Sequence, residues 1–270
     1  MPHVNVNGAC IHYVDSGAGN KTIVFSHGFL MDHSMFDGQV ADLQSRYRCV
    51  RFDHRGQGGS EVTPAGYDID NLAEDAAALI RALDCAPCHF AGLSMGGFVG
   101  LRLAIRYPEL IDSLTLLNTS ADPEPRASVR QYALMAKVAG WLGFRPLVGR
   151  ISRIMFGESF RKDPASSPPL ERWRRFVLSA DRTGILRSVS GVLNRPGVTD
   201  QLSGIKVPTL VIAGEEDTAT PPALARRIHE GIPGSRLVII PGAGHSSTIE
   251  QPERVTEAID DLLAGLNSPG

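Results

Sequence analysis

Features that would mark several special classes of protein are missing from this sequence. Its 27 basic and 29 acidic residues give a net charge of −2, far from the strongly basic balance that favours nucleic-acid binding. No apolar run approaches the roughly 18 to 20 residues of a membrane-spanning helix. The N-terminus lacks the basic-then-apolar profile of a secretory signal peptide. We therefore expect a cytoplasmic protein that binds neither nucleic acid nor a membrane.

Sequence signatures of cofactors and metals are missing as well. There is no Gly-Lys-Ser/Thr for a P-loop, and the Gly-Gln-Gly-Gly segment at 56–59 lacks the third glycine of the dinucleotide fingerprint. His229-Glu230 begins like a zinc-protease motif, but Pro233 occupies the place of the second histidine. Cys85 and Cys88 have no second pair at zinc-site spacing, and four cysteines in 270 residues do not make a disulfide framework. We expect no cofactor and no metal.

What the sequence contains is an ordinary globular composition with a regular alternation. Hydrophobic residues make up 43% and charged residues 21% of the chain. Short apolar runs alternate with helical patterns of 10 to 15 residues, which predicts βαβ units and a mostly parallel sheet with helices on both faces. Residues 4–14, with Asn7-Gly8 as the turn, predict an antiparallel pair. Further strands are expected at 22–26, 49–52, 88–93, 113–117, 209–213 and 236–240. The expected fold class is thus α/β, with about eight strands.

The segment 122–200 interrupts this alternation. It shows helical patterns around 128–139, 146–156, 170–179 and 184–193, and no apolar strand run. It carries 14 Lys or Arg against 7 Asp or Glu, a net charge of +7, whereas the rest of the chain carries 13 against 22, a net charge of −9. We therefore expect a core domain formed by 1–121 and 201–270, with 122–200 inserted as a helical unit.

The most specific local motif is Gly92-Leu93-Ser94-Met95-Gly96. It fits the G-x-S-x-G pattern between a predicted strand and a predicted helix, the context in which this motif exposes a nucleophilic serine. The glycines permit a turn too sharp for flanking Cβ atoms. The Ser94 hydroxyl would lie at a helix N-terminus, where the dipole favours developing negative charge. The alternative is a glycine-rich turn with an incidental serine.

A serine hydroxyl needs a base before it can act as a nucleophile. His245 ends the segment Pro241-Gly242-Ala243-Gly244-His245, just past the last predicted strand. Sites assemble at the carboxyl ends of parallel strands, so His245 is the candidate base. For a lone histidine the ordinary interpretation is a surface loop residue, and the position of His245 argues against it.

The third member of such a site is a carboxylate that orients the histidine. Asp217 and Asp53 each follow a predicted strand. Asp217 is favoured because its loop directly precedes the histidine strand, which gives the chain order Ser94, Asp217, His245. Asp53 remains the rival, and the glutamates at 215–216 are interpreted as solvated loop charges.

These motifs resemble those of α/β-hydrolase-fold serine hydrolases, most closely the 3-oxoadipate enol-lactonase-like and carboxylesterase branch. The similar segments are His-Gly-Phe at 27–29, Asp-His-Arg-Gly-Gln-Gly at 53–58, the turn that carries Ser94 at 92–97 (the nucleophile elbow), and the stretches 217–222 and 249–252. The resemblance implies that 122–200 is a helical cap over the pocket. It also implies an oxyanion hole formed by the backbone N–H groups of Phe29 and Met95. His27 is expected to stabilise the oxyanion turn and not to transfer protons.

The expected function is hydrolysis of a small-molecule carboxylic ester or lactone through an acyl-enzyme on Ser94. Two other activities on the same three residues stay open: carbon–carbon-bond hydrolysis, and cofactor-free haloperoxidase or perhydrolase chemistry. A non-catalytic small-ligand receptor with a hydrolase fold is the alternative from a different class.

The positive charge of 122–200 suggests a hypothesis about substrate charge. Arginines of the cap near the pocket mouth would attract an anionic substrate, and the enol-lactones of the resembled branch bear a carboxylate. The competing interpretation is that these arginines lie on solvated helix faces or pair with the acidic core. The residues concerned are Arg150, Arg153, Arg172, Arg174 and Arg175.

Overall fold

A single mostly parallel sheet forms the centre of the molecule. The computed structural model describes residues 2–267, and within them eight strands lie in the order β1-β2-β4-β3-β5-β6-β7-β8. The pairs β1–β2 and β2–β4 are antiparallel, and the remaining neighbours are parallel. The α/β prediction is confirmed. The strands are β1 His3–Val6, β2 Ala9–Ser16, β3 Thr22–Ser26, β4 Arg48–Phe52, β5 Cys88–Leu93, β6 Ile111–Leu117, β7 Thr209–Gly214 and β8 Arg236–Ile240.

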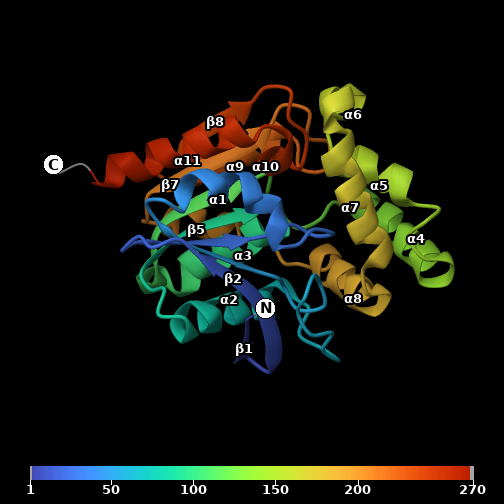
Figure 1. Cartoon of the computed structure of the whole chain (residues 1–270), viewed down its shortest axis with the longest axis horizontal. Coiled ribbons are helices and arrows are strands. Elements are labelled where there is room, and N and C mark those ends of the chain that lie inside the picture. The colour runs from blue at the N-terminus through green and yellow to red at the C-terminus, as the bar shows by residue number, and fades with distance from the viewer. Residues whose placement is uncertain (1, 268–270) are drawn as a thin grey trace.

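Helices cover both faces of the sheet because the strands are apolar on both sides. Along β3, Val24 belongs to one buried cluster and its neighbour Phe25 to the other, as the alternation of strand side chains requires. The first cluster is covered by α2 (Ile69–Ala82), α3 (Met95–Arg106) and α9 (Pro222–Gly231). The second is covered by α1 (Asp37–Leu43) and α11 (Pro252–Asn267), as Figure 1 shows. In the described part of the chain no helix has the length and apolarity needed to cross a bilayer.

Five helices from the middle of the chain lie together on one side of this core (Figure 1). Four match the predicted helical patterns: α4 Arg126–Leu142, α5 Val148–Met155, α7 Ser167–Ser179 and α8 Arg182–Leu193. The fifth, α6 (Glu158–Lys162), was not predicted, because five residues are too few to show a helical period. We refer to residues 122–200 as the helical segment. Two short helical pieces of the core contact this segment. Glu250 of α10 (Ser247–Glu250) accepts from the amide of Gly157, and Met35 of the 3₁₀ turn His33–Phe36 lines a small cavity together with Trp173.

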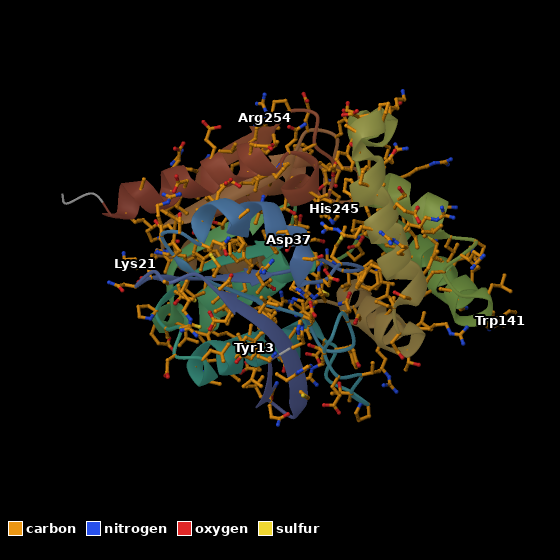
Figure 2. The ribbon with its side chains drawn as sticks, in the orientation of Figure 1. Tyr13, Lys21, Asp37, Trp141, His245 and Arg254 are labelled. Atoms are coloured by element: carbon orange, nitrogen blue, oxygen red, sulfur yellow. The ribbon has the colours of Figure 1, made fainter. Side chains whose placement is uncertain are left out.

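The two tryptophans of the helical segment have opposite environments. Trp173 on α7 is buried, and its indole Nε1 donates a hydrogen bond of 3.2 Å to the carbonyl oxygen of Leu30, which ties the segment to the core. Trp141 at the end of α4 is 88% exposed and projects from the outer tip of the molecule (Figure 2). Packing within the molecule therefore explains an aromatic residue at 173 but not one at 141.

Candidate active site

Ser94 occupies the sharp turn between β5 and α3. Its backbone has φ 53° and ψ −109°, a conformation that L-residues rarely adopt, and its amide donates to Leu117 O at 2.9 Å. The flanking glycines are sterically required: a Cβ on Gly92 would collide with the carbonyl of Gly96, and a Cβ on Gly96 with the carbonyl of Ser26. The G-x-S-x-G pattern thus has the strand–turn–helix geometry that makes it chemically meaningful.

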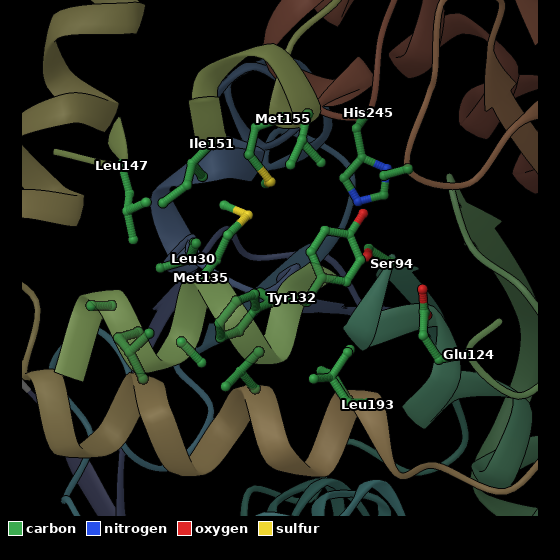
Figure 3. A pocket seen from close by; sticks show the side chains of 18 of the residues that line it. Leu30, Ser94, Glu124, Tyr132, Met135, Leu147, Ile151, Met155, Leu193 and His245 are labelled. Carbon is green, nitrogen blue, oxygen red and sulfur yellow. The ribbon is translucent and has the colours of Figure 1, made fainter. Parts of the chain in front are cut away.

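His245 and Asp217 lie at the carboxyl ends of the last two strands. Asp217 follows β7, His245 follows β8, and His245 Nδ1 is 2.9 Å from Asp217 Oδ2. Ser94 and His245 both line one pocket, and Figure 3 shows both side chains at the same end of it. The structure therefore brings together the three residues selected from the sequence, although they are separated by up to 151 positions along the chain (245 − 94).

Asp217 is held ionised by a dense set of donors. Its Oδ1 accepts from the backbone amides of Ala219 (2.8 Å) and Thr220 (2.9 Å), and its Oδ2 from Asn118 Nδ2 (2.8 Å) and Thr220 Oγ1 (2.7 Å). Burial alone would raise the pKa of Asp217, but His245 and these donors outweigh it and hold the pKa below its usual value. A carboxylate in this state fixes the tautomer of the imidazole beside it.

The same pair sets the proton affinity of His245. Burial disfavours the imidazolium, yet the adjacent Asp217 carboxylate favours it more strongly, so the pKa of His245 lies above 6.5. An imidazole with Nδ1–H directed at Asp217 leaves Nε2 free to accept a proton. That arrangement is suited to a general base.

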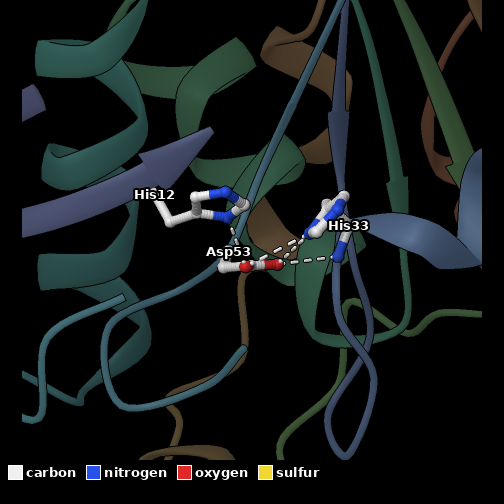
Figure 4. A group of neighbouring side chains, drawn as sticks. All are labelled: His12, His33 and Asp53. Carbon is white, nitrogen blue, oxygen red and sulfur yellow. Dashed lines mark hydrogen bonds and ion pairs between the residues drawn. The ribbon is translucent and has the colours of Figure 1, made fainter. Parts of the chain in front are cut away.

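Asp53, the rival carboxylate, is engaged elsewhere. Its oxygens interact with His12 Nδ1 (2.8 Å), the amide of His33 (2.7 Å), His33 Nδ1 (3.0 Å) and the amide of Gly59 (2.8 Å), as Figure 4 shows for the side chains. Among residues 2–267, His12, His33 and Asp53 are the one group of histidine and acidic side chains close enough together to share a metal ion. Their ligand atoms already pair with one another, which accounts for the cluster without an ion.

The glutamates at 215 and 216 do not reach His245 either. Glu215 accepts from the amide of Gly242 at 3.2 Å. Glu216 accepts from both the amide and the hydroxyl of Ser159, so it tethers the helical segment to the β7 loop. Glu216 thus remains a partly exposed charge of the loop, as interpreted, but its hydrogen bonds to Ser159 also give it a structural role.

The turn at 27–29 lies against the serine. A Cβ on Gly28 would be 3.5 Å from Ser94 Cβ, and Phe29 lines the same pocket. His27 accepts from the amide of His54 at Nε2 (2.9 Å) and lies 2.7 Å from Gly28 O through Nδ1, contacts that hold this turn. Within residues 2–267, no protein group accepts a hydrogen bond from the amide of Phe29 or Met95. Both amides are therefore free to donate to a bound molecule.

The pocket extends from Ser94 into the helical segment. Its walls come mainly from α4, α5 and α8 (Figure 3), and apolar side chains dominate them. The walls include Phe98, Met135, Phe144, Leu147, Ile151, Met155, Ile185, Leu186, Val189 and Leu193.

The arginines considered for substrate attraction do not line this pocket. All five are exposed. Two of them pair with acids: Arg172 lies 3.3 Å from Asp37, and Arg174 lies 3.6 Å from Glu171. The structure therefore agrees with the competing interpretation, in which these arginines are solvated or paired.

Sequence reasoning missed several residues that hold the site together. Asn118 directly follows β6, and its Nδ2 donates to Asp217 and to Gly244 O at 3.0 Å. Glu250 accepts from the amides of Gly157, Gly244 and Ser246, so it joins the His245 loop to the helical segment. The position of Asn118 at a strand's carboxyl end was a usable signal. The resemblance of 249–252 marked the stretch that holds Glu250 but did not indicate its contacts.

Comparisons with known proteins agree with this geometry. Residues 21–252 match the family model described as the alpha/beta hydrolase fold. The chain is 32% identical to 3-oxoadipate enol-lactonase 1 of Acinetobacter baylyi, over 90% of this chain and 89% of that protein. The solved enol-lactonase of Burkholderia xenovorans has a TM-score of 0.91 at 32% identity, covering 97% of this chain and 100% of that one. A thermophilic esterase of Thermogutta terrifontis has a TM-score of 0.91 at 30% identity, covering 99% and 100%.

Proposed function

Because the chain belongs to the alpha/beta hydrolase fold family, we propose that it cleaves a small carboxylic ester or lactone through an acyl-enzyme on Ser94. The observation that carries the proposal is the hydrogen bond between Asp217 and His245, formed beside the pocket that Ser94 lines. Relatives that include an enol-lactonase and an esterase support the same chemistry.

In the proposed acylation, Ser94 Oγ attacks the substrate carbonyl carbon while its proton passes to His245 Nε2. Asp217 stabilises the imidazolium that forms. The negative charge moves to the carbonyl oxygen, where the amides of Phe29 and Met95 are proposed to bind it. When the C–O bond to the alcohol breaks, the imidazolium returns its proton to the departing oxygen.

Deacylation repeats these steps with water. His245 takes a proton from water as the water oxygen attacks the acyl carbon, and the proton then goes to Ser94 Oγ as the acid leaves. Each step uses only this chain's own groups and the substrate. We further propose that residues 122–200 act as the cap that shapes the pocket, over a core of 1–121 and 201–270.

The test combines activity with covalent labelling. Wild type is assayed on 4-nitrophenyl esters and lactones and treated with a serine-reactive fluorophosphonate. We expect Ser94→Ala to lose nearly all turnover and all labelling, with an unchanged fold, because alanine adds no bulk at the elbow. Labelling that persists in Ser94→Ala, or a wild type that cleaves no substrate of either class, would contradict the proposal.

A further inference from the structure

The charges around the pocket differ from what a carboxylate-bearing substrate needs. Among the described residues that line it there is no lysine or arginine, and the one acidic side chain is Glu124. Figure 3 shows the Glu124 carboxylate directed at the inner end of the pocket, toward Ser94 and His245. Its negative charge is close enough to help raise the pKa of His245. The inner end of the pocket therefore has one acidic side chain and no basic side chain in otherwise apolar surroundings.

Arg195, the arginine that pairs with Glu124, is not available to a substrate. Arg195 Nη1 donates to Glu124 Oε2 at 2.7 Å, and the two side chains are 3% and 12% exposed. The guanidinium lies 4.0 Å from the ring centroid of Phe98, and of these two residues only Phe98 lines the pocket. This cation is therefore paired already and separated from the pocket by an aromatic ring.

We infer, on the basis of the proposed function, that this enzyme selects an uncharged apolar acyl group, and that Glu124 is a specificity-determining residue that rejects an acyl carboxylate. The acyl group stays bound to Ser94 after the alcohol leaves, so the walls around Ser94 must hold it. Apolar walls do not replace the water around a carboxylate. Glu124 is itself a carboxylate, so it offers a bound anion no hydrogen-bond donor, and it keeps Arg195 paired. The inference is the opposite of the expectation drawn above from the resemblance, which was an anionic substrate.

The size of the discrimination follows from the titration of the substrate. A carboxyl group with a pKa of about 4.3 is uncharged in roughly one molecule in 500 at pH 7. If only the uncharged form enters, kcat/KM for the acid is about 500-fold below that of a neutral analogue. The ratio falls about tenfold for each pH unit down to about pH 5. Both substrates need the same neutral His245, so the enzyme's own titration cancels from the ratio.

The experiment compares 4-nitrophenyl hexanoate with mono-4-nitrophenyl adipate, which has the same number of acyl carbons and ends in a carboxylate. The methyl 4-nitrophenyl diester of adipate is the neutral control for length and polarity. We expect the hexanoate-to-adipate ratio of kcat/KM to fall from about 500 at pH 7 to about 50 at pH 6. The ratio of hexanoate to the methyl diester is expected to stay constant with pH.

Variants test the role of Glu124. In Glu124→Gln the positive charge of Arg195 is no longer compensated, so we expect the hexanoate-to-adipate ratio at pH 7 to fall at least tenfold. Glu171→Gln is the matched control, because Glu171 is an exposed acid on α7 that pairs with Arg174 and does not line the pocket. Its ratio is expected to equal that of wild type. The wild-type pH series remains a test even if Glu124→Gln fails to fold.

Several results would overturn the inference. A wild-type ratio near one that is flat with pH, or a preference for the adipate monoester, would show that the pocket accepts an anion. An unchanged ratio in folded Glu124→Gln would remove Glu124 from the explanation. Failure of the proposed function is distinguishable, because then none of the three esters is cleaved and Ser94 is not labelled.

Discussion

Replacing Asp217 with asparagine changes one atom at the centre of the site, and the surrounding donors determine the result. Oδ1 accepts two backbone N–H groups, from Ala219 and Thr220, which cannot turn away. The new NH₂ group must therefore occupy the Oδ2 position, where it faces Asn118 Nδ2 and His245 Nδ1. A donor at that place forces His245 to present a lone pair at Nδ1 and to carry its proton on Nε2.

That tautomer cannot act as the proposed base. With the proton on Nε2, His245 has no lone pair directed at the Ser94 hydroxyl, and the imidazolium also loses the Asp217 charge that stabilises it. The loss seen when a triad histidine takes the wrong tautomer is about 10⁴-fold in kcat. At 1.36 kcal/mol for each factor of ten, this corresponds to about 5 kcal/mol of transition-state stabilisation. We expect Asp217→Asn to lose activity on this scale.

The matched control is Asp53→Asn. Asp53 also lies buried and also accepts hydrogen bonds from histidine, but its partners are His12, His33 and Gly59. We expect Asp53→Asn to lower the free energy of unfolding by about 1–3 kcal/mol for each buried donor left unsatisfied, with kcat nearly unchanged in the folded fraction. The assay measures kcat on a 4-nitrophenyl ester, normalised to the folded fraction from circular dichroism. The reasoning is refuted if Asp53→Asn lowers kcat more than Asp217→Asn does at equal folded fraction.

The pH dependence supplies the remaining predictions. His245 must be neutral to act, and since its pKa is raised above 6.5, we expect the acid limb of kcat/KM to have its midpoint above pH 6.5. A rate that stays flat down to about pH 4 would indicate a carboxylate base. Burial raises the pKa of Glu250 to about 7 in the folded protein, against 4.5 without the protein environment. The folded protein therefore binds the Glu250 proton more tightly than the unfolded chain does. This adds to the free energy of unfolding below pH 4.5, and the addition is lost as the pH rises through 7. The wild type therefore gains about 2–3 kcal/mol in free energy of unfolding from this group at pH 5 relative to pH 8, and Glu250→Gln removes that gain. Denaturant unfolding of wild type and Glu250→Gln at pH 5 and at pH 8 tests this. The prediction is contradicted if the free energies of unfolding of the two proteins differ by the same amount at both pH values.

Local patterns in the sequence were sufficient to predict the sheet and the elbow. A buried parallel strand must be apolar on both faces, so runs such as residues 88–93 are visible without any knowledge of their neighbours. The turn at Ser94 needs glycine on both sides because backbone atoms pack where a Cβ would lie, and that requirement is also visible locally. The short helix α6 was missed because it spans less than two helical turns.

Asp217 and Asp53 have similar local sequence contexts. Both aspartates follow strands, and the sequence separated them only by chain order. Their environments differ through long-range contacts: Asn118 and His245 converge on Asp217, whereas His12 and His33 converge on Asp53. Each of these donors comes from a different strand or loop, so no window of sequence contains the contact.

The chemistry of the pocket was decided by tertiary structure alone. The net charge of +7 in residues 122–200 is a property of composition, but an arginine on a helix affects a substrate only if its side chain faces the pocket. Packing turns the five exposed arginines of the helical segment outward and buries Arg195 against Phe98, where it pairs with Glu124. Composition determines how many charges a segment carries, whereas which of them face the substrate depends on how the helices rotate and pack against the core.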